Sequence, residues 1–143
     1  MIHRRYNEGE LLDVAGLNTI RVVLDRSETK RTEIGLETWR AGLVGPRHKH
    51  EQKEQVFFVT AGSGHVSVGN ETREVRKGDM VYVPAGVEHQ TTASPDEDLE
   101  YLLLNAFLSD EKEGHATFAE HIEKVKEIRR AQAENASGEV GKP

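Results

Sequence analysis

The feature that most constrains the fold is a run of short, β-rich segments between Thr19 and Phe107. Each segment is rich in β-branched and aromatic residues, and turn sequences containing glycine, proline, asparagine or aspartate separate it from the next. Short strands at this spacing are typical of a closed sandwich or barrel, and they argue against alternating strand–helix units. The expected strands are residues 19–24, 35–40, 55–60, 65–69, 79–84, 89–93 and 100–107, with a brief strand inside 69–79. The sequence "AGSG" (61–64) predicts a hairpin turn between two of them.

The pattern changes after Phe107, where the chain becomes highly charged. Apolar residues recur there at helical spacing and form one stripe: Phe118, Ile122, Val125 and Ile128. Thr117 followed by Glu120 is a capping-box pattern, so we expect a helix to begin near Phe118. Its apolar stripe either covers the barrel or contacts a second subunit.

A chain of 143 residues suits one domain with a real core, and no internal repeat suggests a second barrel. The predicted organisation is an N-terminal strand segment at 1–34, a barrel at 35–108, a helix at 109–135 and a flexible tail at 136–143. The strand at 18–24 is expected to close an exposed sheet edge in a homodimer.

Composition excludes several classes of function. The absence of cysteine excludes disulfides, zinc–thiolate sites and thiol nucleophiles. Net charge is −6 and the basic residues are scattered, so no nucleic-acid partner is expected. No apolar run approaches the roughly 20 residues needed to cross a bilayer, and the first residues lack an apolar signal core, so we expect a soluble, cytoplasmic protein without a membrane partner.

The segment "VGPRHKHEQKEQVFF" (44–58) contains two histidines one residue apart, His48 and His50. Alternate residues of a strand face the same side, so both imidazoles can point together. Two imidazole nitrogens at about 2.0–2.1 Å suit a single metal ion. The spacing therefore predicts half of a metal site.

The wider spacing resembles the two motifs of the cupin superfamily. The first motif, G-x5-H-x-H-x3–4-E-x6-G, fits on Gly42, His48, His50 and Gly62. The second, G-x5-P-x-G-x2-H-x3-N, fits on Gly78, Pro84, Gly86 and His89. The resemblance covers residues 42–93, roughly the middle third of the chain. It implies an all-β fold, a small double-stranded β-helix or jelly-roll barrel with a metal-capable mouth, here followed by a C-terminal α-helix.

The chain departs from the cupin motifs at two positions. Counting from His50 places Glu54 at the acidic position, whereas counting back from Gly62 places Gln55 there. Strand alternation favours Gln55, because Phe57 and Val59 then also point inward. Ala93 stands where the family often has asparagine, which is not a metal ligand of the family. The metal ligands implied are therefore His48, His50 and His89, with Gln55 preferred to Glu54 as the fourth.

Three imidazoles and an amide would leave a divalent ion's charge uncompensated, which favours anionic ligands and Lewis-acid chemistry. Zn, Fe, Ni, Mn and Cu are not distinguished by these ligands. The resemblance implies a metalloenzyme of dioxygenase, isomerase or cyclase type, stabilising an anionic intermediate of a small oxygenated substrate. The alternative is a cupin that binds or senses a small molecule without catalysis.

Candidate catalytic residues are Glu54, Tyr82 and Arg40, with Arg40 suited to a substrate carboxylate because guanidinium binds it in a bidentate manner. In "GLETWRAG" (35–42), either Glu37 and Trp39 or Thr38 and Arg40 face inward. Glu37 and Glu100 are further candidates for a general acid or base. Asn105 shares a strand face with Tyr101 and Leu103, whereas no ligand role is expected for His65, His115 or His121.

Overall fold

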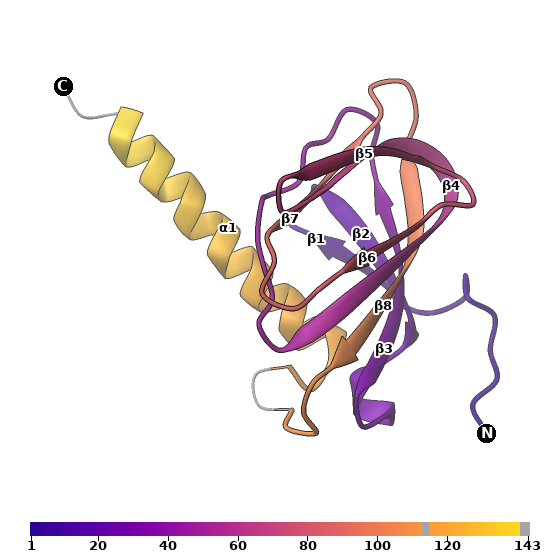
Figure 1. Ribbon diagram of the computed structural model, residues 1–143. Coiled ribbons are helices and arrows are strands. Elements are labelled where there is room, and N and C mark those ends of the chain that lie inside the picture. The colour runs from indigo at the N-terminus through magenta and orange to yellow at the C-terminus, as the bar shows by residue number, and fades with distance from the viewer. Residues whose placement is uncertain (113–114, 141–143) are drawn as a thin grey trace.

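The computed structural model of the protein describes residues 1–112 and 115–140. It confirms a mostly β architecture with one C-terminal helix (Figure 1). The elements are β1 (Leu11–Val14), β2 (Asn18–Leu24), a 3-10 turn (Arg26–Glu28), β3 (Thr32–Trp39), β4 (Lys53–Val68), β5 (Glu71–Arg76), β6 (Met80–Val83), β7 (His89–Ala93), β8 (Leu99–Phe107) and α1 (Phe118–Val140).

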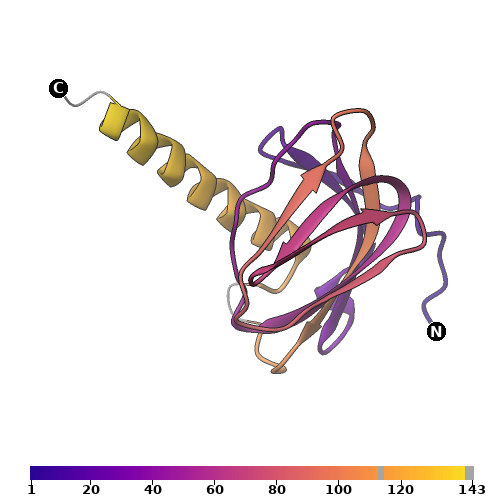
Figure 2. The same ribbon diagram turned by 45° about the horizontal axis from the view of Figure 1, so that its top comes forward.

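Strand β4 organises the barrel. Its first half pairs with β8 and β6, and its second half pairs with β5 and β7, always antiparallel. The strand therefore passes from one sheet to the other and joins them along one continuous backbone. The remaining strands extend the first sheet in the order β1-β2-β3-β8, and the two sheets curl around a common interior (Figure 1 and Figure 2).

The hairpin turn predicted at 61–64 is wrong, because β4 runs through these residues without reversing. Its pairing with β8 shifts register between Val59 and Ala61, and Gly62 adopts a φ of 74°. Glycine adopts positive φ at little cost, which suits a tight turn or a bend beside a β-bulge equally well. Here it marks the place where β4 bends between the sheets.

Replacing Gly62 with alanine should lower the free energy of unfolding by at least about 2 kcal/mol. A Cβ atom at this position would lie 1.7 Å from the backbone oxygen of Asp98, in addition to the cost of positive φ. Gly42 is the matched control, since its φ is 80° but no atom lies within 4 Å of its added Cβ. Gly42→Ala should cost about 1 kcal/mol. Equal losses for the two variants in urea denaturation would contradict this account of the bend.

Two hydrophobic clusters stabilise the fold. The larger lies between the two sheets and includes Trp39, Phe57, Val59, Leu99 and Tyr101. The smaller joins β1 and β2 to the helix and is formed by Val14, Ile20, Phe118 and Ile122. The first turns of α1 therefore cover the barrel with their apolar stripe. Farther along, Ile128 is 58% exposed, and the helix runs away from the sheets (Figure 1 and Figure 2).

The predicted start of the helix is confirmed at Phe118. The Thr117 hydroxyl accepts a hydrogen bond from the Glu120 amide at 3.0 Å, as an N-cap residue does. Asp25 accepts a second one from the Phe118 amide at 2.9 Å and also binds the Ser27 amide in the 3-10 turn. One carboxylate thus connects α1 to the loop after β2. The helix extends to Val140, beyond the predicted end at 135, and residues 141–143 of the predicted tail lie outside the described residues.

The strand predicted as an exposed edge, β2, is paired on both sides, with β1 and with β3. Its neighbour β1 covers the edge, because the chain folds back after Val14 within the same molecule. Strand β2 therefore offers no free edge to a second subunit, and dimerisation through the N-terminal segment stays a prediction. Within the described residues, no helix has the length and apolar character needed to cross a bilayer.

Candidate metal centre

Two backbone segments bring the rings of His48 and His89 close together. The His48 amide donates to the His89 carbonyl at 3.0 Å, and the His89 amide donates to the His48 carbonyl at 2.8 Å. In such an antiparallel pair the two side chains lie on the same side of the backbone, and their ring centroids are 4.3 Å apart. The Gly86 amide donates to the His50 carbonyl at 2.8 Å, so the loop before β7 also holds the second histidine in place.

The side-chain nitrogens of His48, His50 and His89 all lie within 4.8 Å of one another. The Nδ1 atom of His48 lies 2.9 Å from the Pro46 carbonyl, and Nδ1 of His89 lies 3.3 Å from the Val87 carbonyl. The carbonyl accepts a hydrogen bond from Nδ1–H, so Nε2 carries the lone pair and is the nitrogen available to a metal. Both rings are therefore oriented as metal-binding histidines usually are.

The protonation of this cluster also suits a metal. Burial lowers the pKa of His89 to about 4, and the charges of neighbouring groups act in the same direction. Burial also lowers the pKa values of His48 and His50 below the ordinary range. At neutral pH the three imidazoles are uncharged, which is the form that binds a metal ion.

Gln55 lies on β4, buried in the wall of the same cavity. Its Nε2 donates to Oδ1 of Asn105 at 2.9 Å, and Nδ2 of Asn105 donates to Glu33 at 2.7 Å. These bonds fix the orientation of the amide and leave Oε1 of Gln55 without a partner among the described residues. A buried, unpaired carbonyl oxygen is costly, and a metal ion or a bound ligand would satisfy it. The three imidazoles therefore fit a divalent ion, and Gln55 brings a further oxygen to the wall of the same cavity.

The histidines open onto a cavity of about 250 Å³. This volume is near the lower end for small-molecule sites, roughly 300–1,000 Å³. Trp39, Phe57 and Tyr101 form much of its apolar wall. The helix covers it with Phe118 and Ile122. The cavity therefore suits a small ligand.

Two buried charged residues in this cavity extend the site beyond the histidines. On β3, Glu37 and Trp39 face inward and line the cavity, whereas Thr38 and Arg40 do not. Burial raises the pKa of Glu37 from 4.5 to about 7, against the opposing charges of Arg129 and Lys53. Asn18 donates to Oε1 of Glu37 at 2.7 Å. Of the two buried charged residues, only Glu37 was a candidate general acid or base in the sequence analysis.

Lys53 is the second of these residues, and sequence reasoning missed it. It is 3% exposed, and its Nζ makes no hydrogen bond to any described residue. Burial lowers its pKa to about 8, although Glu33 and Glu37 act to raise it. The signal for Lys53 was present, because it lies two residues before Gln55 on a strand whose alternate residues face inward.

Two histidines without a predicted ligand role also lie near the site. The ring centroid of His121 is 5.9 Å from that of His50 and 4.3 Å from that of His115. Nε2 of His115 in turn lies 2.8 Å from the buried Glu33 carboxylate. Helical spacing could have identified His121, since it falls on the same face as Phe118 and Ile122.

The three predicted catalytic candidates do not line the cavity. Glu54 alternates with the inward-facing Lys53 and Gln55, so its side chain lies on the outer face of β4. There it neighbours Tyr82, which is 47% exposed. Arg40 follows the end of β3 and is exposed. Glu100 faces the outside as well, where its carboxylate accepts a hydrogen bond from Thr60.

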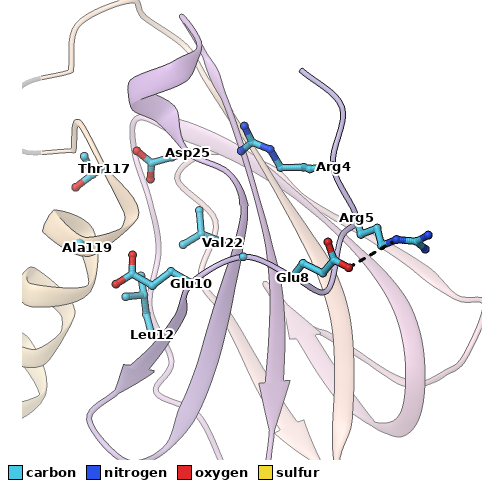
Figure 3. Close-up of a pocket in the computed structure, with 10 residues that line it drawn as sticks. Arg4, Arg5, Glu8, Glu10, Leu12, Val22, Asp25, Thr117 and Ala119 are labelled. Atoms are coloured by element: carbon cyan, nitrogen blue, oxygen red, sulfur yellow. Dashed lines mark ion pairs between the residues drawn. The ribbon is translucent and has the colours of Figure 1, made fainter. Parts of the chain in front are cut away.

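A more open hollow of about 570 Å³ lies between the N-terminal segment and the start of α1 (Figure 3). Four of its five charged side chains, all but that of Glu10, have structural partners among the described residues. Arg4 pairs with Glu28 at 2.8 Å, Arg5 lies 3.6 Å from Glu8, and Asp25 caps α1. This hollow brings no free set of donors together, so the histidine cavity is the candidate site.

Comparison with known proteins identifies the family of this chain. Residues 35–105 match the cupin domain family. An uncharacterized protein of Streptomyces coelicolor is 41% identical over 61 residues, which are 43% of this chain and 57% of the relative. One from Methanocaldococcus jannaschii is 37% identical over 43 residues, 30% of this chain and 34% of the relative. The chain thus matches only part of the length of these relatives.

Solved structures share the fold at low sequence identity. KdgF from a Halomonas species is 24% identical with a TM-score of 0.64, covering 73% of this chain and 93% of KdgF. The polyketide cyclase RemF of Streptomyces resistomycificus is 20% identical with a TM-score of 0.64, covering 74% and 79% of the two chains. A predicted oxalate decarboxylase of Thermotoga maritima is 17% identical with a TM-score of 0.68, and the match covers 75% of this chain and 100% of the other. With its two-sheet barrel and its histidine cluster, this chain belongs to the cupin family.

Proposed function

We propose that this protein is a metal-dependent enzyme that transfers a proton to or from carbon in a small oxygenated substrate, as an isomerase, a cyclase or a lyase does. The observation that carries the proposal is a buried carboxyl group, Glu37, with a pKa raised to about 7 in the cavity of the three histidines. A general acid or base works best when its pKa lies near the operating pH.

The residues of the cavity would have separate roles in such a reaction. His48, His50, His89 and Gln55 would hold a divalent ion, which supplies Lewis-acid polarisation of a substrate oxygen when bound. Glu37 accepts a proton in its ionised form and donates it back in its neutral form. Asn18 fixes one of its carboxyl oxygens, so the group is positioned before a substrate arrives.

The apolar wall keeps this chemistry away from water. The rings of Phe57 and Tyr101 stack with centroids 4.5 Å apart, and the Tyr101 hydroxyl binds both Trp39 at 3.0 Å and Thr91 at 3.1 Å. These contacts make a rigid surface beside the histidines. Electrostatic interactions are stronger where water is excluded, which increases the effect of a single carboxylate.

The likeness to RemF, a polyketide cyclase, agrees with a proton-transfer reaction but does not select it. At 20% identity only the fold is shared, and one fold hosts many chemistries. The proposal therefore depends on Glu37 rather than on the relatives. Binding without turnover is the second candidate, favoured by the helix that covers the cavity.

Solvent exchange tests the proposal directly. Metal-loaded protein is incubated in D₂O with a panel of small diketones, keto acids and hydroxy acids, while proton NMR follows deuterium incorporation and an electrode follows oxygen. We expect deuterium to enter the carbon beside a carbonyl faster than with metal-free protein, and without oxygen uptake. Oxygen consumption would instead indicate a dioxygenase-type reaction, and saturable binding without exchange would indicate a binding module.

A further inference from the structure

The charge of the cavity is opposite to that of the whole protein. The chain has a net charge of −6. The charged side chains that line the cavity are cationic except for Glu37: Lys49, Lys53, Lys124 and Arg129. A concave site lined by one sign of charge attracts ligands of the opposite sign. The cavity is thus a positive site on a negative molecule.

Lys53 is the cation placed deepest in this lining. Its Nζ has no hydrogen-bond partner among the described residues, although the side chain is 3% exposed. Its Nζ lies 5.4 Å from the centroid of the Phe107 ring, but a buried ammonium group without a hydrogen bond is costly unless another group compensates it. The buried carboxylates Glu33 and Glu37 bind His115 and Asn18 instead, and neither forms an ion pair with Lys53 within the described residues.

The other cations reach the cavity from its rim and from the helix. Arg129 on α1 donates to the Val14 carbonyl at 2.8 Å, so its guanidinium is held against β1, and its Nε has no partner among the residues described. Lys49 and Lys124 are exposed at the rim. Helix α1 lies outside the part of the chain that matches the family, residues 35–105. Half of the positive lining therefore comes from an element that the family match does not include.

We propose that the cavity binds a small monocarboxylate, with Lys53 as the ion-pair partner of its anionic group. Arg129, Lys49 and Lys124 supply the positive field that draws the anion in. Glu37 lines the same cavity, and its negative charge disfavours a dianion such as inorganic phosphate. This inference names the substrate class of the proposed enzyme, so it depends on that proposal for turnover but not for binding.

Trp39 provides the measurement, because it is the only tryptophan in the chain and it lines the cavity. Metal-free protein, prepared with a chelator, is titrated with pyruvate and with pyruvamide, its uncharged analogue of nearly the same size. The removal of metal excludes direct chelation as the source of any preference. We expect pyruvate to bind about tenfold more tightly, as a charge-assisted hydrogen bond predicts, and inorganic phosphate not to compete.

Variants locate the effect. Lys53→Met should abolish the preference for pyruvate, and Lys53→Arg should retain it. Arg129→Gln should weaken pyruvate binding a few-fold, whereas Arg130→Gln, an exposed neighbour outside the cavity, should not. If circular dichroism shows that Lys53→Met does not fold, two comparisons still test the inference. One is the affinity of pyruvate for Arg129→Gln against Arg130→Gln, and the other is the affinity of the native protein for pyruvate against pyruvamide.

Three results would overturn the inference: no saturable binding of pyruvate, equal binding of pyruvamide, or an undiminished preference in folded Lys53→Met. Failure of the proposed function looks different. Charge-selective binding without deuterium exchange would refute the enzyme and keep the carboxylate site. Exchange without charge selectivity would refute the carboxylate site and keep the enzyme.

Discussion

Replacing His89 with alanine should reduce bound metal from about one ion per chain to a small fraction of that, with at least a hundredfold loss of affinity. The expected loss is large because the ring nitrogen of His89 lies within 4.8 Å of those of His48 and His50. The substitution therefore removes one of three converging imidazoles. His48→Ala should behave in the same way. Elemental analysis of purified protein and competition with a chromogenic chelator measure both quantities.

His65→Ala is the matched control, since His65 is an exposed histidine on β4 that does not line the cavity. It should leave metal content unchanged. Gln55→Ala should weaken binding by a smaller factor than the histidine variants, and Glu54→Ala should not weaken it. Full occupancy in both His48→Ala and His89→Ala would refute the metal centre.

The sequence predicted the histidine cluster because motif spacing and strand alternation are both local properties. His48 and His50 are one residue apart, and the turn at Gly86 returns the chain to His89. Alternation also placed Gln55 on the inner face with Phe57 and Val59, where the structure has them. These inferences required only the direction in which consecutive side chains point.

Other parts of the site could not be predicted because they depend on packing between distant segments. Arg129 reaches the cavity only because α1 lies against β1, and Asp25 binds the start of that helix. The prediction of Arg40 as the partner of a carboxylate failed for the same reason. An exposed position beyond the end of β3 and a buried position on β4 look alike in the sequence when both carry a basic residue.

The error at Gly62 has a similar origin. Glycine in a β-rich segment signals positive φ, but the choice between a turn and a bulge depends on what the next residues pair with. Residues 63–68 pair with β5 and β7 instead of folding back on 55–60. This pairing is long-range, so the local signal could not show that the chain continues into the second sheet.

Glu37→Gln should lower the rate of the proposed proton transfer by about 10² to 10⁴-fold. Glutamine retains an oxygen that can accept the hydrogen bond from Asn18, so the change removes the ionisable proton with little change of shape. In the native protein, a reaction that uses Glu37 as a base should gain rate as pH rises through about 7, and the variant should lack this limb. Steady-state deuterium exchange between pH 5 and 9 measures both, with Glu54→Gln on the outer face as the control.

Glu37→Gln should raise the free energy of unfolding at neutral pH, although it lowers the rate of the proposed reaction. Because burial raises the pKa of Glu37 from 4.5 to about 7, the unfolded chain loses its proton at lower pH than the folded protein does. Between these values the unfolded state binds fewer protons, so the native protein loses stability as pH rises, by up to about 3 kcal/mol. Glutamine does not titrate, so Glu37→Gln should approach the native protein in stability below pH 4.5 and exceed it by the largest margin above pH 7. Urea denaturation at pH 4.5, 6 and 8 measures this margin. A margin that shrinks as pH rises would show that Glu37 is ionised and stabilising at neutral pH, and such a carboxylate would be a poor general acid.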